Sequence, residues 1–294
     1  MKLRRKIASH DFTADMMPSN RKAVFTDVMK LHWFEFLKMG LILFVAYLPI
    51  LCSLFLQDVY EIRVQGDIPE NASYETIQKV LLEIVSLRTM NAFFCVLCLL
   101  IFGIVLAGVL RIVRQYAWEE IVFFWRDLWI GIKQNRVQIT GIFAIIGVQN
   151  LVSIYLIGTG QGTGNQIISL VGIIFASMSL LLLAPVWAFA CVQVSVYSNS
   201  FLQNFKLGLA LYAQSISKTV LILGALLLPW IVSLVPNIWI RLVGQAVGVF
   251  FLPIALLIWF LYVLSLLDKY INPVHFPELV GKGLYKTNSI PTEE

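Results

Sequence analysis

Long uncharged apolar stretches recur along this chain and alternate with shorter segments that carry most of its charge. Each stretch has about the 17 to 25 residues that a helix needs to cross a bilayer. A helix is expected because lipid offers no partners to backbone N–H and C=O groups, and the alternating pattern of a barrel strand is absent. The six predicted spans are residues 39–56, 91–110, 139–157, 167–192, 219–235 and 242–264.

The distribution of Lys and Arg predicts how these spans are oriented. Eighteen of the 22 basic residues lie in four segments, which are 1–38, 111–138, 193–218 and 265–294. Cytoplasmic flanks keep their positive charge during insertion, so we predict that these four segments, including both termini, are cytoplasmic. The expected organisation is a cytoplasmic tail over 1–30, a membrane domain over 31–270 and a second cytoplasmic tail over 271–294.

Composition excludes several classes of protein. With 59% hydrophobic and 13% charged residues, and a mean hydropathy of +0.81, the chain is far more apolar than a soluble globular domain. We therefore place it in a membrane, with the lipid bilayer as its first partner. The net charge of +5 is explained by topology and anionic lipid. Because no basic patch lies beside stacking aromatic residues, nucleic acid is not an expected partner.

The order of the spans favours an all-α fold of three helical hairpins, each with one span going out and one coming back. Weak internal similarity would make Gly103, Pro185 and Pro253 equivalent positions on the three returning spans. Shared composition is the alternative explanation. Prolines inside spans are candidate helix kinks, which in some transporters build a substrate site and more often serve packing. The candidate kinks are Pro49, Pro185, Pro229 and Pro253.

Residues for catalysis or metal binding do not form a recognisable pattern. His10, His32 and His275 lie outside the spans and far apart in sequence, and no nucleophile–base order or paired-carboxylate element accompanies them. Cys95 and Cys98 form a CxxC without a second pair or a nearby histidine, so small helix-packing residues are the simpler interpretation. We expect no enzymatic activity, no cofactor and no metal.

The cytoplasmic segment 111–138 carries an aromatic pattern with helical spacing. Its apolar positions are Ile121, Phe124, Trp125, Leu128, Trp129 and Ile132. Such a face predicts an amphipathic helix that lies in the membrane interface before the third span. Asp127 is unusual there because an acid beside a negative membrane surface needs a partner. Two explanations for Asp127 stay open at this point. It contacts another protein, or it pairs locally with Arg126, Arg114 or Lys133.

The same segment resembles the YesL-like family of bacterial multi-pass membrane proteins, a domain of unknown function. The candidate docking or interfacial residues that it contributes are Arg111, Arg114, Glu119, Phe124, Trp125, Arg126, Asp127, Trp129, Gly131, Lys133 and Asn135. The chain departs from the family pattern at Trp118-Glu119, where Arg-Gly-Glu is usual. The likeness extends over roughly residues 30–270. It implies a multi-pass protein of a bacterial cell membrane that is often associated with carbohydrate uptake, and it supplies no catalytic residue.

Two functions follow as expectations. The favoured one is an accessory or regulatory protein that docks a membrane partner, such as a sugar-transport permease or a membrane sensor. This choice depends partly on the family association. The alternative is a transporter or channel for a small neutral or apolar solute, since no predicted span contains an ionisable residue. Its candidate polar residues are Gln149, Asn150, Ser177, Ser179, Gln193 and Gln245.

Overall fold

The computed structural model describes residues 18–69, 73–232, 235 and 237–284. These residues form helices joined by short turns, without a β-strand among them. The helices are α2 (Arg21–Gly66), α3 (Tyr74–Ala117), α4 (Phe124–Thr163), α5 (Gln166–Met178), α6 (Ala184–Val196), α7 (Phe201–Leu226), α8 (Leu228–Ile231), α9 (Ile238–Phe250), α10 (Leu252–Tyr270) and α11 (Asn272–His275). A π-helix, η2 (Ser179–Leu183), joins α5 to α6, and a 3-10 turn, η4 (Pro277–Leu279), follows α11.

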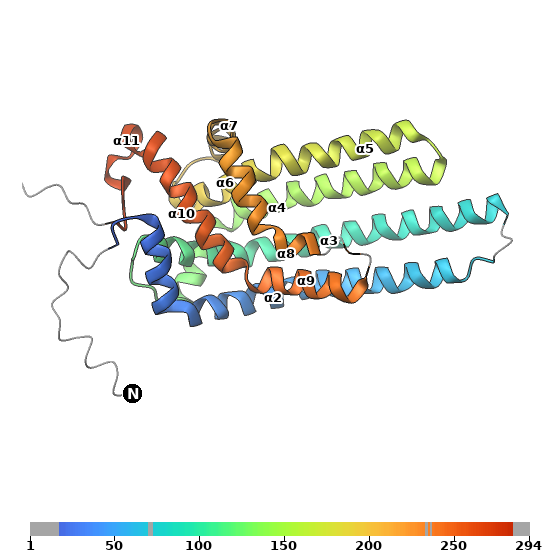
Figure 1. Ribbon diagram of the computed structural model, residues 1–294, viewed down its shortest axis with the longest axis horizontal. Helices are drawn as coiled ribbons and strands as arrows, with labels where there is room; N and C mark the ends of the chain where they lie inside the picture. The colour runs from blue at the N-terminus through green and yellow to red at the C-terminus, as the bar shows by residue number, and fades with distance from the viewer. Residues whose placement is uncertain (1–17, 70–72, 233–234, 236, 285–294) are drawn as a thin grey trace, which may run out of the picture.

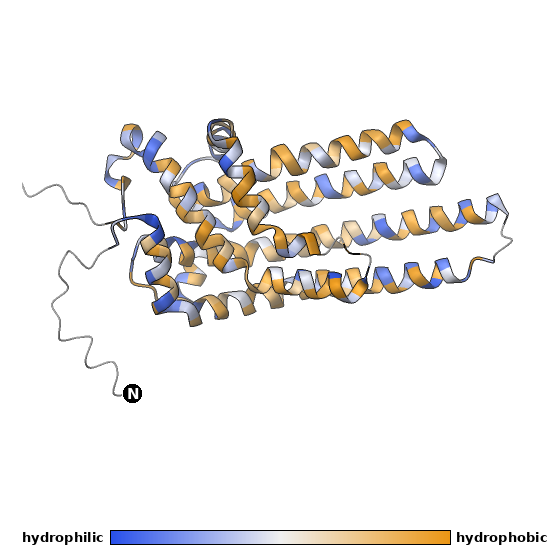
Figure 2. Cartoon of the chain, viewed as in Figure 1, coloured by the Kyte–Doolittle hydropathy of each residue, from blue (hydrophilic) through white to orange (hydrophobic). Residues whose placement is uncertain are grey.

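Six helices in the described part of the chain are long and apolar enough to cross a membrane, with α5, η2 and α6 counting as one. The prediction of an all-helical, multi-pass membrane protein is confirmed at this level. Figure 2 shows apolar residues over the middle of the long helices and polar residues gathered toward their ends. Many large apolar side chains are exposed, and lipid is the solvent that can cover them.

The last two predicted spans have the wrong boundaries. The fifth was placed at 219–235, but α7 begins at Phe201 and ends at Leu226. The sixth was predicted as one helix over 242–264, whereas Phe251 separates α9 from α10. Pro253 lies in the first turn of α10, where its missing N–H costs no hydrogen bond. Only α10 of these two is long enough to be a candidate span, because α9 has 13 residues.

The candidate proline kinks divide into two groups. Pro185, Pro229 and Pro253 each lie in the first turn of a helix. Pro229 and Pro253 follow breaks between helices, whereas Pro185 follows the π-helix η2 within one continuous span. Pro49 lies inside α2, whose departure from helical backbone angles is at His32 instead. Gly103, predicted to be equivalent to Pro185 and Pro253, lies within the unbroken α3. The superposition of the three hairpins stays a prediction.

Helices α2 to α5 run along the length of the molecule, while α7 and α10 cross them at one end (Figure 1). The helix pair α3 and α4 is the closest long-range pairing, and glycines make it possible. A Cβ atom on Gly131 would lie 3.0 Å from Gly108 Cα, and one on Gly108 would lie 2.7 Å from the Leu128 carbonyl oxygen. Small residues let membrane helices approach until their backbones touch. This interface holds the second and third of the long helices together.

The core lies at the end of the bundle where α2 begins. Its largest fully buried side chains come from α2, α3, α4, α6 and α10, and include Phe36, Met39, Leu43, Leu110, Ile112, Ile139, Ile142, Phe189, Phe260, Leu264 and Leu267. We call this the closed end. Arg21 binds Asp268 and the Lys282 carbonyl there, both at 2.7 Å. The first and last described segments therefore lie together. The two termini fall outside the described residues, so their cytoplasmic location stays a prediction.

The α3–α4 interface generates the first testable prediction. Gly131→Ala would place a Cβ 2.7 Å from Arg111 Cβ and force the two helices apart. Overpacking of this kind costs about 1 to 3 kcal/mol, which outweighs the gain of about 1 kcal/mol in helix propensity. We expect a lower melting temperature for the detergent-purified variant.

Gly224→Ala is the matched control, since no atom lies within 4 Å of the added methyl group. It should melt at or above the temperature of the original protein. Equal melting temperatures for the two variants would contradict the close α3–α4 packing.

Candidate functional site

The predicted interfacial segment does not form a separate helix. Residues 111–117 end α3, a turn follows, and α4 runs without interruption for 40 residues from Phe124. The prediction of a separate short helix is therefore wrong. The reason is that Leu128 and Gly131 pack against α3, so a bend into the membrane plane would remove the contacts that hold the two helices together.

Asp127 is buried inside this turn, with 2% of its surface exposed. Its carboxylate accepts a hydrogen bond from the Phe123 N–H at 2.7 Å. Guanidinium nitrogens of Arg111 and Arg126 lie 3.9 and 4.0 Å away. An acid in the first turn also faces the positive end of the helix dipole. The geometry favours local pairing over a docking contact, with Arg111 in the place expected for Arg114 or Lys133.

The other predicted residues divide between the interior and the surface. Arg114 donates to the Ser195 carbonyl at 2.7 Å and stacks on Trp118. Glu119 adopts a left-handed backbone conformation with φ 55°. Lys133 lies over Trp129, while Arg126 lies over Phe123.

The predicted apolar face is only partly buried. Phe124, Asn135 and Ile132 are half-buried. Trp125 and Trp129 are 71% and 58% exposed, so only part of the predicted apolar face packs against the bundle.

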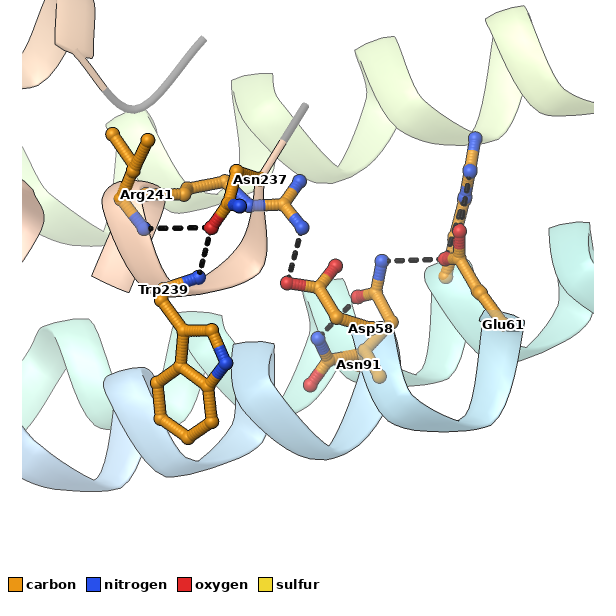
Figure 3. Close-up of polar contacts among 9 residues, drawn as sticks. Asp58, Glu61, Asn91, Asn237, Trp239 and Arg241 are labelled. Atoms are coloured by element: carbon orange, nitrogen blue, oxygen red, sulfur yellow. Dashed lines mark hydrogen bonds and ion pairs between the residues drawn. The ribbon is translucent and has the colours of Figure 1, made fainter. Parts of the chain in front are cut away.

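A second site lies toward the opposite end of the long helices and was not predicted. It brings together Asp58 and Glu61 from α2, Arg88 from α3 and Arg241 from α9. Figure 3 shows the Arg241 side chain reaching from α9 toward Asp58, where the two form an ion pair. Arg88 holds Glu61 through two hydrogen bonds of 2.6 and 2.8 Å. Such a two-pronged contact is the strongest form of carboxylate recognition by arginine.

Amide side chains complete this ion-pair cluster. Gln57 donates to Glu61 at 2.8 Å, and Asn91 bonds to Gln57 and to the Ser53 hydroxyl. Asn237 begins α9, with its side-chain oxygen accepting from the N–H groups of Trp239 and Ile240 (Figure 3). This cap fixes the first turn of α9, which carries Arg241.

The cluster borders a cavity of about 400 Å³ between α2, α3, α4 and α9. Its polar lining is Gln57, Asp58, Glu61, Arg88, Asn91, Asn150, Gln161 and Arg241. Its apolar lining includes Leu54, Val85, Ala92, Ile154 and Ile157. The two carboxylates and two guanidinium groups cancel, so the cavity has no formal net charge. We call the end of the bundle that holds it the cavity end.

The ion-pair cluster lies beside α4, short of the end of that helix. Gly158 of α4 faces Val85, and Gly162 faces Leu82, so α4 extends one to two turns beyond the level of Arg88. No charged residue occurs between Arg136 and Lys206, a stretch that contains this end of α4 and all of α5 and α6. The ion pairs are thus flanked by an uncharged helical hairpin. Ionisable groups in such surroundings are costly and usually serve function.

Sequence reasoning missed this site because its charges lie just outside the uncharged windows used to define spans. The helices are longer than those windows: α2 has 46 residues and α3 has 44. The close spacing of Gln57, Asp58 and Glu61 was an available signal, but nothing linked it to position 241. Among the polar residues proposed for a transporter, Asn150 lines the cavity, whereas Gln193 lies fully buried elsewhere, beside Asn204.

Side chains that bind metals are scattered among the described residues. Within them, no group of three or more His, Cys, Asp or Glu side chains is placed to hold a metal ion. Cys95 borders the cavity as a free thiol, and Cys98 is buried.

The ion-pair cluster generates the second prediction. Arg88→Gln leaves the Glu61 carboxylate without its guanidinium partner, at an expected cost of about 2 kcal/mol in unfolding free energy. The value is below that of a fully buried pair because the Arg88 side chain is 43% exposed. Chemical denaturation in mixed detergent micelles measures it.

The double variant Arg88→Gln with Glu61→Gln should recover part of this loss, since no charge is then left unpaired. Arg63→Gln, an exposed arginine on the next turn of α2, is the control and should change stability little. Equal changes in unfolding free energy for Arg63→Gln and Arg88→Gln would contradict a structural role for the cluster.

No family model, curated protein or solved structure matches this chain. The resemblance to the YesL-like family therefore stays a prediction, and the geometry of the site is the basis for a function.

Proposed function

We propose that this chain is a multi-pass membrane protein that binds a small neutral polar solute in the cavity between α2, α3, α4 and α9. The observation that carries the proposal is the presence of two ion pairs beside a cavity whose remaining wall is the part of α4 that follows Arg136 and carries no charged residue. Charges in such a place are expensive, and proteins keep them mainly where they contact a solute or an ion.

The balance of charge in the cavity favours a neutral or zwitterionic solute over an ion. Asp58 is paired with Arg241, and Glu61 with Arg88, so an added ion would have to break one of these pairs. A neutral polar molecule needs only hydrogen-bond partners. Amide groups of Gln57, Asn91, Asn150 and Gln161 offer both donors and acceptors around the cavity. This set of groups suits a polar solute better than the apolar one that was the other expectation.

The two ends of the bundle differ in a way that suits solute entry from one side. Large buried side chains of α2, α3, α4, α6 and α10 fill the closed end. The cavity instead lies where α2 and α3 extend past the core and where the short α9 packs against α2. We propose that the solute enters from the cavity end, as in a carrier that faces that side or a receptor for an external solute.

A second candidate is the accessory role, in which the protein docks a membrane partner. The observation that favours it is an exposed apolar surface, made of Ile121 and the aromatic residues Phe123, Trp125 and Trp129. Next to this surface, Gly108 packs against Gly131 and Asp127 is buried, so the turn and the helix that carry the surface are held in place. Through the family resemblance, the proposed partner is a sugar-transport permease or a membrane sensor of a bacterial cell membrane.

Solute binding is the third prediction. Zwitterionic amino acids, neutral sugars and polyols are added separately to the purified protein, and the melting temperature is measured. A solute that binds only the folded protein raises the melting temperature. At a concentration 100 times its dissociation constant, it adds about 2.7 kcal/mol to the free energy of unfolding. Asn150→Leu removes one amide from the cavity wall and should abolish the shift.

Gln149→Leu is the matched control, because Gln149 is the adjacent amide and does not line the cavity. It should keep the shift. Absence of a shift with every solute class, or equal losses in the two variants, would contradict the proposal.

Docking is tested separately as the fourth prediction. Chemical crosslinking in native membranes, followed by mass spectrometry, compares the original protein with the variant Trp125→Ala, Trp129→Ala. Loss of a stoichiometric partner from stably expressed protein is the expected result, because two exposed rings are removed. Trp239→Ala alters a 65% exposed tryptophan toward the cavity end and serves as the control. An identical partner profile in all three proteins would refute docking through this surface.

A further inference from the structure

A groove lies between α7 and α10 at the closed end. Helix α7 bends at Ser215, where φ is −135° and ψ is 23°, and the Ser215 hydroxyl donates to the Leu211 carbonyl at 2.6 Å. Beyond the bend, α7 and α10 lie next to each other (Figure 1). Residues of both helices line a groove of about 930 Å³. The groove is independent of the cavity at the other end, since the two share no lining residue.

The base of the groove is held by a chain of hydroxyl groups. Ser215 Oγ lies 3.0 Å from Thr219 Oγ1, which lies 3.0 Å from the Tyr262 hydroxyl. These contacts connect α7 to α10 just below the bend. They fix the spacing of the two walls, so the groove is a built feature of the fold.

The lining divides into a cationic part and an apolar part. Lys218 of α7 and Lys269 of α10 supply the charge, beside the polar Ser217 and Ser265. Leu221, Ile222 and Leu266 supply the apolar part, which continues along the spans. Leu221 is 72% exposed, so this part of the wall is open to whatever solvent or lipid fills the groove.

Neither lysine is neutralised within the described part of the chain. No ion pair there involves Lys218 or Lys269, although Lys269 lies over the Tyr270 ring. The acid next to Lys269 in sequence, Asp268, is turned inward and held by Arg21 at 2.7 Å and by Asn272 at 2.8 Å. The groove therefore presents two positive charges above an apolar wall.

We propose that this groove binds one anionic phospholipid. Its phosphate would lie between Lys218 and Lys269, and an acyl chain would follow Leu221 and Ile222 toward the interior of the membrane. Charge complementarity selects an anionic headgroup, and basic pockets between membrane helices are known to bind such lipids. A free phosphate would leave the apolar wall uncovered, so the combination of the two parts favours a lipid.

Native mass spectrometry of the full-length protein in detergent tests the proposal. Dioleoylphosphatidylglycerol is titrated, and dioleoylphosphatidylcholine is titrated in parallel. We expect the anionic lipid to bind preferentially at one site, and the variant Lys218→Gln, Lys269→Gln to weaken that binding by about tenfold or more. Leu221→Ser should weaken it as well, since the acyl chain loses part of its wall.

The variant Lys30→Gln, Lys206→Gln removes the same charge from exposed lysines outside the groove and is the matched control. It should bind the lipid like the original protein. Equal weakening in both double variants would overturn the site, because the effect would then be general attraction. Displacement of the lipid by glycerol phosphate at the same concentration would also overturn it, since the groove would then recognise a soluble anion.

Discussion

The contact between α3 and α4 is the constraint on which the rest of the structure depends. At Gly108 and Gly131 the two backbones come so close that no side chain fits between them. Membrane helices gain little from burying apolar surface against one another, because lipid is equally apolar, so close backbone approach is a main source of their association. This contact keeps α4 antiparallel to α3 and in contact with it from its first turn. It also buries Asp127, which then closes the turn between the two helices.

The same pairing positions the polar groups at the other end of the molecule. Because α4 follows α3 past Val85, it forms one wall of a cavity whose charged groups come from α2, α3 and α9. Arg241 can reach Asp58 only because the chain breaks at Phe251 and lets α9 pack along α2. A single continuous helix over 242–264 would lack the break that directs α9 along α2. The helix break and the ion pair are thus parts of one arrangement.

Polar chemistry in this protein is concentrated at three places that differ in their charge balance. The cavity between α2, α3, α4 and α9 pairs each acid with a guanidinium group, so it suits a neutral solute. The groove between α7 and α10 carries lysines without acids, so it suits an anion. The turn after α3 joins its charges to aromatic rings, as when Lys282 stacks on Trp118 and pairs with Glu120. These differences depend on which helices meet. The overall charge of +5 does not determine where acidic and basic side chains are paired.

The all-helical class and the number of candidate spans followed from the sequence by itself, although the structure bounds the last two spans differently. An uncharged stretch of spanning length must become a helix in lipid whatever its neighbours are, so six candidate spans were found without any knowledge of packing. Tertiary structure alone decided where those helices end and which side chains meet. Asp58, Glu61, Arg88 and Arg241 are up to 183 positions apart in the chain, from 58 to 241, and each looked like an ordinary charge beside a span. Their pairing depends on close helix packing and on the break at Phe251, neither of which local hydrophobicity encodes.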